Sequence, residues 1–434
     1  MRLQTTTLAI AAIATASTWA QPVGNAVEVF TTADTLCVPY RIPAIACTGS
    51  GKLVAVADYR HSRTDIGVLK NGKGEMTDGE IDIHCRISTD NGLTWGETIV
   101  VADGLGARAT DAFHVGYGDP AIVADWSSDD VAMLCCSGDV SFFAGTRQNH
   151  QGIAAFHSAD GGLTWDEPFD LAESFYSQLD SNSSGPVCAL FVGSGKIHQS
   201  RAVQVGGHKR LYCAVLVRAS DKSRRNYVFY SDDFGRSWTL LGDPDTPAIP
   251  QGGDEPKVEE LPSGDVVISS RIRGGRAYNF FTFTDAASGQ GTWGEMAISD
   301  ESCGGTVAEN NSTNGEILII PALRTADGTP TWVALQSVPF GPGRNNVGIY
   351  YKELASAEDY ATPKAFAADW DGRYQVSFTG SAYSTMVMQA DGKVAFFYEE
   401  DTYKAVSGGG FTLIYAPIAL ETITGGALAV PTKP

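Results

Sequence analysis

Short runs of alternating apolar and polar residues fill most of the chain and favour β-strands. Residues 52–57 (KLVAVA) and 265–270 (DVVISS) are examples, and Gly, Asp, Asn and Pro separate such runs from one another. Long segments with an apolar residue every three or four positions, which would indicate amphipathic helices, are nearly absent. Together with 48 glycines, this pattern predicts an all-β sandwich, barrel or propeller.

An internal repeat favours the propeller among these three fold classes. Residues 88–95, 158–165 and 231–238 all match S-x-D-x-G-x-[ST]-W, and a degenerate fourth copy ends at Trp293. A chance match at any one position is on the order of one in a million. The first three copies begin 70 (158 − 88) and 73 (231 − 158) residues apart, which leaves room for about one four-stranded propeller blade and a loop per repeat.

Each copy is predicted to form a β-hairpin turn. The Asp side chain would accept backbone N–H bonds, the Gly would supply a positive φ, and the Trp would pack between neighbouring sheets. A side chain with the same role in every blade belongs to the scaffold. The repeats therefore predict architecture and not chemistry.

The N-terminus reads as a secretory signal peptide over residues 1–20. Arg2 precedes an apolar run at residues 8–16, and small residues come before the expected cleavage point. Residues 21–434 are predicted to form a single propeller domain, because all-β propellers commonly exceed the average domain size. No later apolar run reaches the roughly 20 residues of a transmembrane helix. We expect a secreted, extracellular monomer.

Cysteines and glycosylation motifs fit this compartment. The eight cysteines contain no C-x-x-C pair, so they do not resemble a zinc site, and an oxidising environment allows disulfides whose pairing the sequence leaves open. Sequons occur at Asn182, Asn310 and Asn311.

The charge of the chain excludes some partners. A formal net charge of −19 argues against nucleic acid or an anionic membrane, because both require a positive field. The chain has no H-E-x-x-H, EF-hand, P-loop or G-x-S-x-G motif. The sequence therefore gives no support for a metalloprotease, a nucleotide-binding protein or a serine hydrolase. No cofactor or metal is expected.

The repeats resemble the Asp-boxes of sialidases, and residues 40–43 (YRIP) resemble the [FY]-R-I-P motif that precedes the first box in that family. The resemblance runs from about Tyr40 to Glu399. It is to bacterial and fungal exo-sialidases (neuraminidases), and a Kdn-preferring enzyme is one variant of this type. It implies a six-bladed β-propeller whose partner is a sialylated glycan or free sialic acid.

A sialic acid carries a carboxylate on its anomeric carbon, and planar guanidinium groups bind such a group in a bidentate manner. In a chain of net negative charge, that requires a local cluster of arginines. The resemblance implies Arg41, Arg271 and Arg344 for this role. Arg273 and Arg276 remain alternatives to Arg271.

The nucleophile implied by the resemblance is Tyr383, with Glu255 as its base. A carboxylate attacking beside the substrate carboxylate would be repelled, whereas a neutral tyrosine activated by a carboxylate avoids this repulsion. Glu255 lies sixteen residues before Arg271, and a hairpin between them would bring both to one end of a blade. Glu259 and Glu260 are the alternatives to Glu255.

Asp65 is the general acid implied by the resemblance. It follows Arg60 by five residues in a polar loop, as the corresponding aspartate does in the family. Protonating the leaving oxygen and then activating water favours a raised pKa. Arg60 would contact the carboxylate side of the sugar or its O4 hydroxyl, and Asp78 and Asp82 are alternatives to Asp65.

Glu399 is implied to orient Arg41, with Glu400 as the alternative. Together these residues predict a retaining exo-α-sialidase acting on Neu5Ac or Kdn. Residues 111–117 and the surroundings of Arg147 could line a pocket for either sugar. The alternatives are a Kdn-specific hydrolase and a non-catalytic Asp-box propeller that binds glycans.

Overall fold

The structure, a computed structural model, describes residues 25–31, 38–70, 74, 76–309, 313–402 and 411–431. The signal peptide predicted over residues 1–20 lies outside these ranges. Within the described ranges, no helix is long and apolar enough to cross a membrane.

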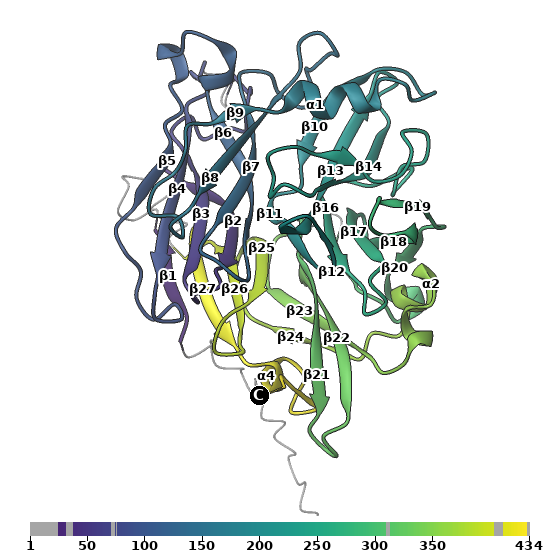
Figure 1. Cartoon of the computed structure of the whole chain (residues 1–434). Helices are drawn as coiled ribbons and strands as arrows, with labels where there is room; N and C mark the ends of the chain where they lie inside the picture. The colour runs from purple at the N-terminus through teal and green to yellow at the C-terminus, as the bar shows by residue number, and fades with distance from the viewer. Residues whose placement is uncertain are drawn as a thin grey trace, which may run out of the picture.

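The described strands form six sheets arranged as a ring around a central axis (Figure 1). Blade 1 consists of β2 (Tyr40–Cys47), β3 (Leu53–Arg60), β4 (Ile81–Ser88) and β5 (Ile99–Ala102). Blade 2 consists of β6 (Tyr117–Ala124), β7 (Val131–Ser137), β8 (Gly152–Ser158), β9 (Phe169–Asp170) and β11 (Gly195–Lys196). Blade 3 consists of β10 (Val187–Val192), β12 (His198–Val205), β13 (His208–Ala219), β14 (Arg224–Ser231) and β15 (Thr239–Leu240).

The second half of the chain forms the remaining three blades. Blade 4 consists of β16 (Pro256–Glu260), β17 (Val266–Ile272), β18 (Gly275–Asp285), β19 (Gln290–Trp293) and β20 (Ala297–Ser299). Blade 5 consists of β21 (Ile317–Arg324), β22 (Pro330–Pro339), β23 (Val347–Leu354), β24 (Gly372–Gln375) and β28 (Leu428–Ala429). Blade 6 consists of β25 (Ser381–Met388), β26 (Val394–Glu400), β27 (Thr412–Ile418) and β1 (Val27–Phe30). The predicted six-bladed β-propeller is confirmed.

Blade 6 closes the ring, because it contains strands from both ends of the chain. β1 pairs antiparallel with β27, with Val27 opposite Tyr415 and Glu28 opposite Ile414. Val29 and Phe30 are each only 1% exposed. The first described strand is thereby sealed into the last blade.

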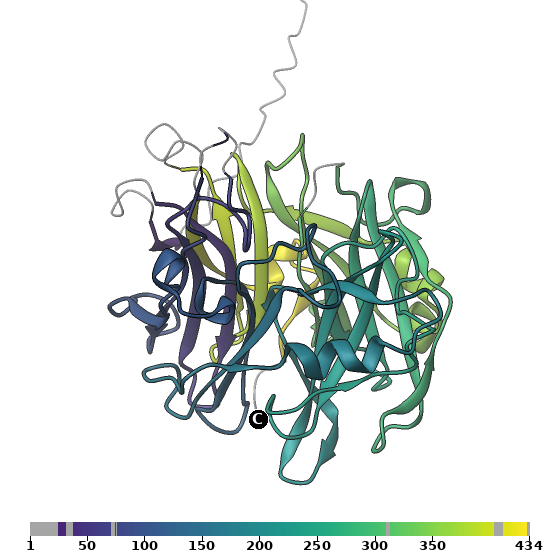
Figure 2. The same cartoon turned by 90° about the horizontal axis from the view of Figure 1, so that it is seen from above.

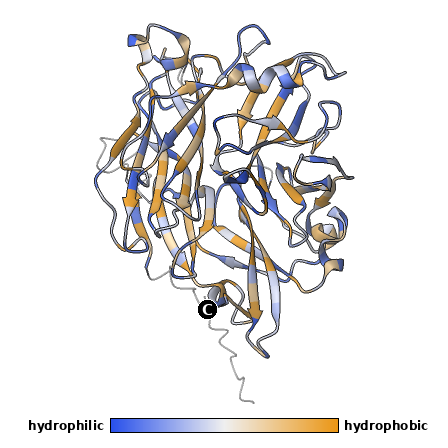
Figure 3. Ribbon diagram, in the orientation of Figure 1, coloured by the Kyte–Doolittle hydropathy of each residue, from blue (hydrophilic) through white to orange (hydrophobic). Residues whose placement is uncertain are grey.

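The hydrophobic core is divided into layers between neighbouring blades. One cluster joins Val123 of blade 2 to Phe229 of blade 3, and five further large clusters fill the other blade interfaces. Figure 3 shows the apolar residues concentrated in the strands. The short helices α1 (Ala172–Tyr176) and α2 (Pro363–Ala367) lie near the upper and right edges of the molecule in Figure 1, and Figure 2 shows the ring of blades from above.

The three full repeats form the turns between the third and fourth strands of blades 1 to 3, as predicted. In the second copy, Asp160 Oδ1 accepts bonds from the Thr164 backbone N and Ser158 Oγ, both at 2.9 Å, and the Gly162 N donates to Ser158 Oγ at 2.9 Å. The same bonds recur in residues 88–95 and 231–238. The repeat glycine has a positive φ each time, such as +88° at Gly162.

Each repeat also fastens its blade to the preceding one. The Tyr415 hydroxyl of blade 6 donates to the Asn91 carbonyl of the first repeat at 2.9 Å. His157 of blade 2 likewise contacts the Phe234 carbonyl of the third repeat at 3.0 Å. The degenerate copy also contacts the preceding blade, but through a different donor: Arg210 of blade 3 donates to the Ala286 carbonyl at 2.7 Å. Its role is structural, like that of the full copies.

Seven of the eight cysteines lie in the described ranges, and none of these seven forms a disulfide. Cys37 lies outside the described residues, as do the sequons at Asn310 and Asn311. The third sequon residue, Asn182, is 7% exposed, and its Nδ2 donates to the Leu179 carbonyl at 2.6 Å. In this conformation Asn182 stabilises a turn and is closed to a glycan.

Candidate active site

The predicted site residues gather at the N-terminal ends of innermost strands, which lie near the centre of Figure 1. Three of these strands, β2, β6 and β25, carry β-bulges there. Within two of the bulges, Ile42 and Asp119 have φ values of 56° and 59°. Non-glycine residues adopt this region rarely, and bulges of this kind re-aim side chains next to functional sites. Local backbone geometry therefore turns these strand ends toward the site.

Glu399 on β26 ties the ends of two strands together. Its Oε1 accepts from Arg41 Nε at 2.7 Å and from the Ile42 backbone N at 2.8 Å. Its Oε2 accepts from the Tyr383 backbone N at 3.1 Å. Glu399 is 0% exposed, so its charge is compensated entirely by these donors. The same carboxylate positions both Arg41 and the strand segment that carries Tyr383.

Tyr383 and Glu255 form the centre of the site. The Tyr383 hydroxyl donates to Glu255 Oε1, and Arg271 Nη1 donates to Glu255 Oε2 at 2.8 Å. Tyr383 and Glu255 are 7% and 8% exposed. Burial, and then the charge of Glu255, raise the pKa of Tyr383 well above its usual value. The phenol is therefore neutral and has a carboxylate base in direct contact.

The hairpin predicted to join Glu255 and Arg271 is present. β16 and β17 pair with Pro256 opposite Ser270, and the Arg271 backbone N donates to the Glu255 carbonyl at 3.1 Å. The adjacent side chains are thereby held at one end of blade 4.

Arg344 completes a group of three arginines around the tyrosine. The guanidinium carbons of Arg41 and Arg344 lie 5.5 and 5.4 Å from the centre of the Tyr383 ring. The Nε of Arg344 is buried without a hydrogen-bond partner, which leaves this guanidinium available to an anion. Arg344 and Arg271 also favour the phenolate form of Tyr383. This acidic protein thus gathers three arginines around one tyrosine.

Arg60 and Asp65 lie in direct contact. Arg60 Nη1 donates to Asp65 Oδ1, and the Asp65 side chain is 74% exposed. The charge of Arg60 holds the pKa of Asp65 below its usual value, whereas the sequence reading favoured a raised value. The reason is tertiary: the attraction of Arg60 for the charged carboxylate outweighs desolvation, which by itself would raise the pKa.

Two buried carboxylates that sequence reasoning missed share Arg60. Arg60 Nη2 donates to Asp58 Oδ2 at 2.6 Å and to Asp119 Oδ1 at 3.4 Å, and the Asp119 backbone N donates to Asp58 Oδ1 at 2.9 Å. Burial raises the pKa of Asp58 to about 6, and burial together with the charge of Asp58 raises the pKa of Asp119 well above its usual value. The sequence signal was a single aspartate inside each of two apolar strand runs, since a buried carboxylate needs a partner.

The alternatives weighed from the sequence make other contacts. Glu259 is paired with Lys196 and Arg201, while the fully buried Arg276 donates to Ser269 Oγ at 3.0 Å. Glu260, Glu400 and Asp82 contact Ser200, Ser377 and His61, respectively. Of the candidate glutamates, it is Glu255 that contacts Tyr383.

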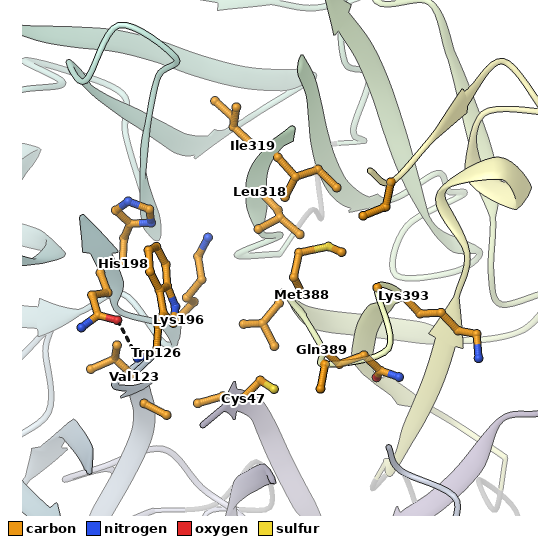
Figure 4. A pocket seen from close by; sticks show the side chains of 18 of the residues that line it. Cys47, Val123, Trp126, Lys196, His198, Leu318, Ile319, Met388, Gln389 and Lys393 are labelled. Carbon is orange, nitrogen blue, oxygen red and sulfur yellow. Dashed lines mark hydrogen bonds between the residues drawn. The ribbon is translucent and has the colours of Figure 1, made fainter. Parts of the chain in front are cut away.

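A separate cavity of about 980 Å³ lies at the opposite end of the innermost strands (Figure 4). Cys47 and Met388, the last residues of β2 and β25, line it together with Trp126 and Leu318. Five or six strand residues separate these positions from Tyr383 and Arg41, or about 17–20 Å. The cavity is thus distinct from the predicted site.

The fold and the arginine–tyrosine–glutamate arrangement define an Asp-box propeller of the sialidase type. The chain belongs to the BNR repeat-like domain family, whose model matches residues 72–395.

Two curated relatives are sialidases. The chain is 31% identical over 241 residues to a sialidase of Micromonospora viridifaciens, covering 54% of this chain and 32% of that one. It is 24% identical over 212 residues to a sialidase of Clostridium perfringens, covering 46% of this chain and 48% of that one. The matches thus span less than half of the length of each relative.

Solved structures share the fold. The Hadza microbial sialidase Hz136 superposes with a TM-score of 0.66 at 18% identity, covering 92% of this chain and 69% of that one. The intramolecular trans-sialidase from Ruminococcus gnavus, in complex with oseltamivir carboxylate, gives a TM-score of 0.67 at 18% identity, covering 95% and 99%. The resemblance to sialidases inferred from the Asp-boxes is confirmed.

Proposed function

We propose that this protein is a secreted, retaining exo-α-sialidase that releases terminal sialic acids from glycoconjugates through a tyrosyl-sugar intermediate. The observation that carries this proposal is the buried bond from the Tyr383 hydroxyl to Glu255, inside a group of three arginines. A propeller that only binds glycans needs the arginines but has no use for a nucleophile paired with a base.

The arginines would bind the carboxylate on the anomeric carbon. Arg344 offers a guanidinium whose Nε is unpaired, while Glu399 fixes Arg41 through its Nε and so leaves the terminal nitrogens of Arg41 for the sugar. Arg271 holds Glu255 through Nη1. Binding the carboxylate on these groups places the anomeric carbon over Tyr383.

In the first step, Asp65 donates its proton to the glycosidic oxygen as the bond from that oxygen to the anomeric carbon breaks. The Tyr383 oxygen attacks the anomeric carbon and its proton passes to Glu255. In the second step, Asp65 takes a proton from water, whose oxygen attacks the same carbon. The tyrosyl bond breaks and Glu255 returns the proton to Tyr383. Two inversions give net retention.

The aglycone must alter the surroundings of Asp65 before the first step. Asp65 is 74% exposed and paired with Arg60, which favours its ionised form. A sugar that covers this carboxylate removes water from it, and desolvation raises the pKa of a carboxyl group. We infer that only bound substrate brings Asp65 into its acidic form, while Arg60 and Asp119 bind a ring hydroxyl nearby.

The preference between Neu5Ac and Kdn belongs to the same proposal, with a Kdn-specific hydrolase as the alternative. Of the residues considered from the sequence, Arg147 is held by Glu173 and Asp180 at 2.7 Å each. Release of the two sugars from matched aryl glycosides separates the two specificities. Proton NMR of the first product separates hydrolysis with retention from intramolecular transfer.

Tyr383→Phe tests the proposed nucleophile. Loss of the attacking oxygen should lower kcat on an aryl sialoside by about 1,000-fold or more, while a sialic acid analogue should still bind because the arginines remain. A 2,3-difluorosialic acid probe should add to the Tyr383 peptide in a mass spectrum of the parent protein, and this adduct should be absent from the variant.

Tyr398→Phe is the matched control. Tyr398 is 4% exposed on the neighbouring strand β26, and its hydroxyl contacts Glu400 at 3.3 Å. The same change there should leave kcat within a few-fold of the parent. Unchanged turnover of Tyr383→Phe would refute the assignment.

A further inference from the structure

A group of metal-ligating side chains lies in blade 1, outside the residues assigned above. The ligand atoms of His61, Glu80 and Asp82 lie within 4.8 Å of one another. His61 Nε2 is 2.8 Å from Asp82 Oδ2 and 3.8 Å from Glu80 Oε1, and His84 Nε2 is 3.7 Å from the same Asp82 oxygen. His61, Glu80 and Asp82 thus share one small space, and His84 lies beside the Asp82 oxygen.

Strand pairing and aromatic packing hold the imidazoles in place. Asp82 and His84 are two residues apart on β4 and share one face of the sheet. Tyr59 lies opposite Asp82 on β3, stacks on the His84 ring at 4.6 Å, and meets the His61 ring edge-on at 4.6 Å. One tyrosine ring therefore fixes the orientation of both histidines.

His84 lies beside these three residues and is held in one orientation. It is 8% exposed, and its Nδ1 is 2.8 Å from the Tyr40 hydroxyl. Its Nε2 therefore points toward Asp82 at a distance too long for a hydrogen bond. Asp82 Oδ1 accepts from the Gly104 backbone N at 2.9 Å, which leaves Oδ2 as the ligand atom. Outer contacts of this kind are typical of histidine and carboxylate metal ligands.

The donor set matches a divalent transition metal ion. Zinc binds imidazole nitrogen and carboxylate oxygen at about 2.0–2.2 Å, so tetrahedral ligand atoms lie about 3.4 Å apart. The observed separations of His61 Nε2 from Asp82 Oδ2 and from Glu80 Oε1, 2.8 and 3.8 Å, lie on either side of this value. Calcium and magnesium prefer oxygen ligands alone.

We propose that His61, Glu80 and Asp82 bind one zinc-like ion that clips the end of β3 to the start of β4, with His84 packed beside Asp82. His61 directly follows Arg60, and Asp65 lies between the two joined positions. The ion would displace the exposed Arg108, whose Nη2 lies 3.2 Å from Glu80 Oε1. It would limit movement of the segment that presents Asp65. Ion binding does not depend on the proposed glycosidase activity.

Isothermal titration of the chelator-treated full chain with zinc chloride tests the site. One ion should bind per chain, and His61→Ala should weaken binding by at least about tenfold. His114→Ala is the matched control, because it removes a histidine from an exposed His–Asp pair with a 2.7 Å contact that has no third ligand. Absence of zinc binding, or equal affinity in His61→Ala and the parent, would overturn the proposal.

Limited trypsin digestion tests whether zinc joins the two strand ends, and it does not depend on glycosidase activity. Arg63 and Lys70 lie between the two joined strand ends, so zinc should slow cleavage after them in the parent chain and not in folded His61→Ala. Circular dichroism confirms that the variant folds. Cleavage at the same rate with and without zinc would overturn the clip.

Discussion

Three arginines of the predicted site each have a carboxylate partner that fixes their position. Glu399 holds Arg41, Glu255 holds Arg271, and Asp58 holds Arg60. Because these contacts exclude water, a change at one member alters the pKa of the next. The charge state of a residue in this site therefore depends on its partner as well as on the residue itself.

The Asp58–Asp119 pair predicts a specific pH dependence. The pKa of Asp58 is raised from 3.8 to about 6, so the folded state binds more protons than the unfolded chain between these values. The stability from this group is present below about pH 4 and is lost as pH rises through 6. Asp119→Asn removes the second charge, so the decline in unfolding free energy from pH 4.5 to 7.5 should become smaller.

Urea unfolding at both pH values measures this decline. Asp125→Asn is the control: Asp125 is 9% exposed, and hydrogen bonds hold its pKa below the usual value, so it does not titrate in this window. Equal declines in the parent and in Asp119→Asn would contradict the predicted coupling.

The Asp-box turns act as connectors between blades at the scale of the element. Their internal hydrogen bonds shape the hairpin, while the outward face of each turn packs on the preceding blade. In the first copy, Gly92 has φ +80° and sits against the ring of Tyr415 in blade 6. Glycine is required there both by the backbone conformation and by the close approach of the ring.

Gly92→Ala should therefore lower the unfolding free energy by about 3 kcal/mol or more, because the added methyl overlaps the Tyr415 ring. Gly206→Ala separates the two causes, since Gly206 has φ +62° and no atom within 4 Å of the added methyl. It should lose only the backbone strain, about 1–2 kcal/mol. Equal losses in urea unfolding would show that packing between the blades adds nothing.

At the scale of the whole molecule, the main feature is that β1 closes the ring of six blades. Phe30 on β1 is 1% exposed, and its ring lies 4.8 Å from that of Tyr40 in blade 1 and 6.4 Å from that of Phe397 in blade 6. It therefore joins the first and last blades. The group of three arginines lies in a chain whose formal net charge is −19.

Phe30→Ala should lower the unfolding free energy by about 3–5 kcal/mol through the cavity it leaves. Val27→Ala, on the same strand but partly exposed, should lose less than about 1.5 kcal/mol. Tryptophan fluorescence during urea unfolding measures both variants. A similar small loss in each would argue that β1 does not seal the ring.

Much of this molecule was predictable from local patterns. The Asp-box repeat predicted the blades because its turn depends on residues within eight positions. The motif resemblance singled out Arg41, Glu255, Tyr383 and Arg344, which the structure brings to one place. Whether these residues act as proposed stays a prediction. Each of Asp58 and Asp119 stands out only as a lone aspartate in an apolar strand run, and their importance arises from sharing Arg60 across two blades.

The order of amino acids alone was enough to predict a propeller and to nominate most of its site, because hairpin turns and strand alternation are short-range properties of the chain. The folded structure decided which of several arginines and glutamates meet, why the pKa of Asp65 falls instead of rising, and how His61, Glu80 and Asp82 converge beside it. Those outcomes depend on burial and on contacts between residues far apart in the chain, and no local pattern encodes either.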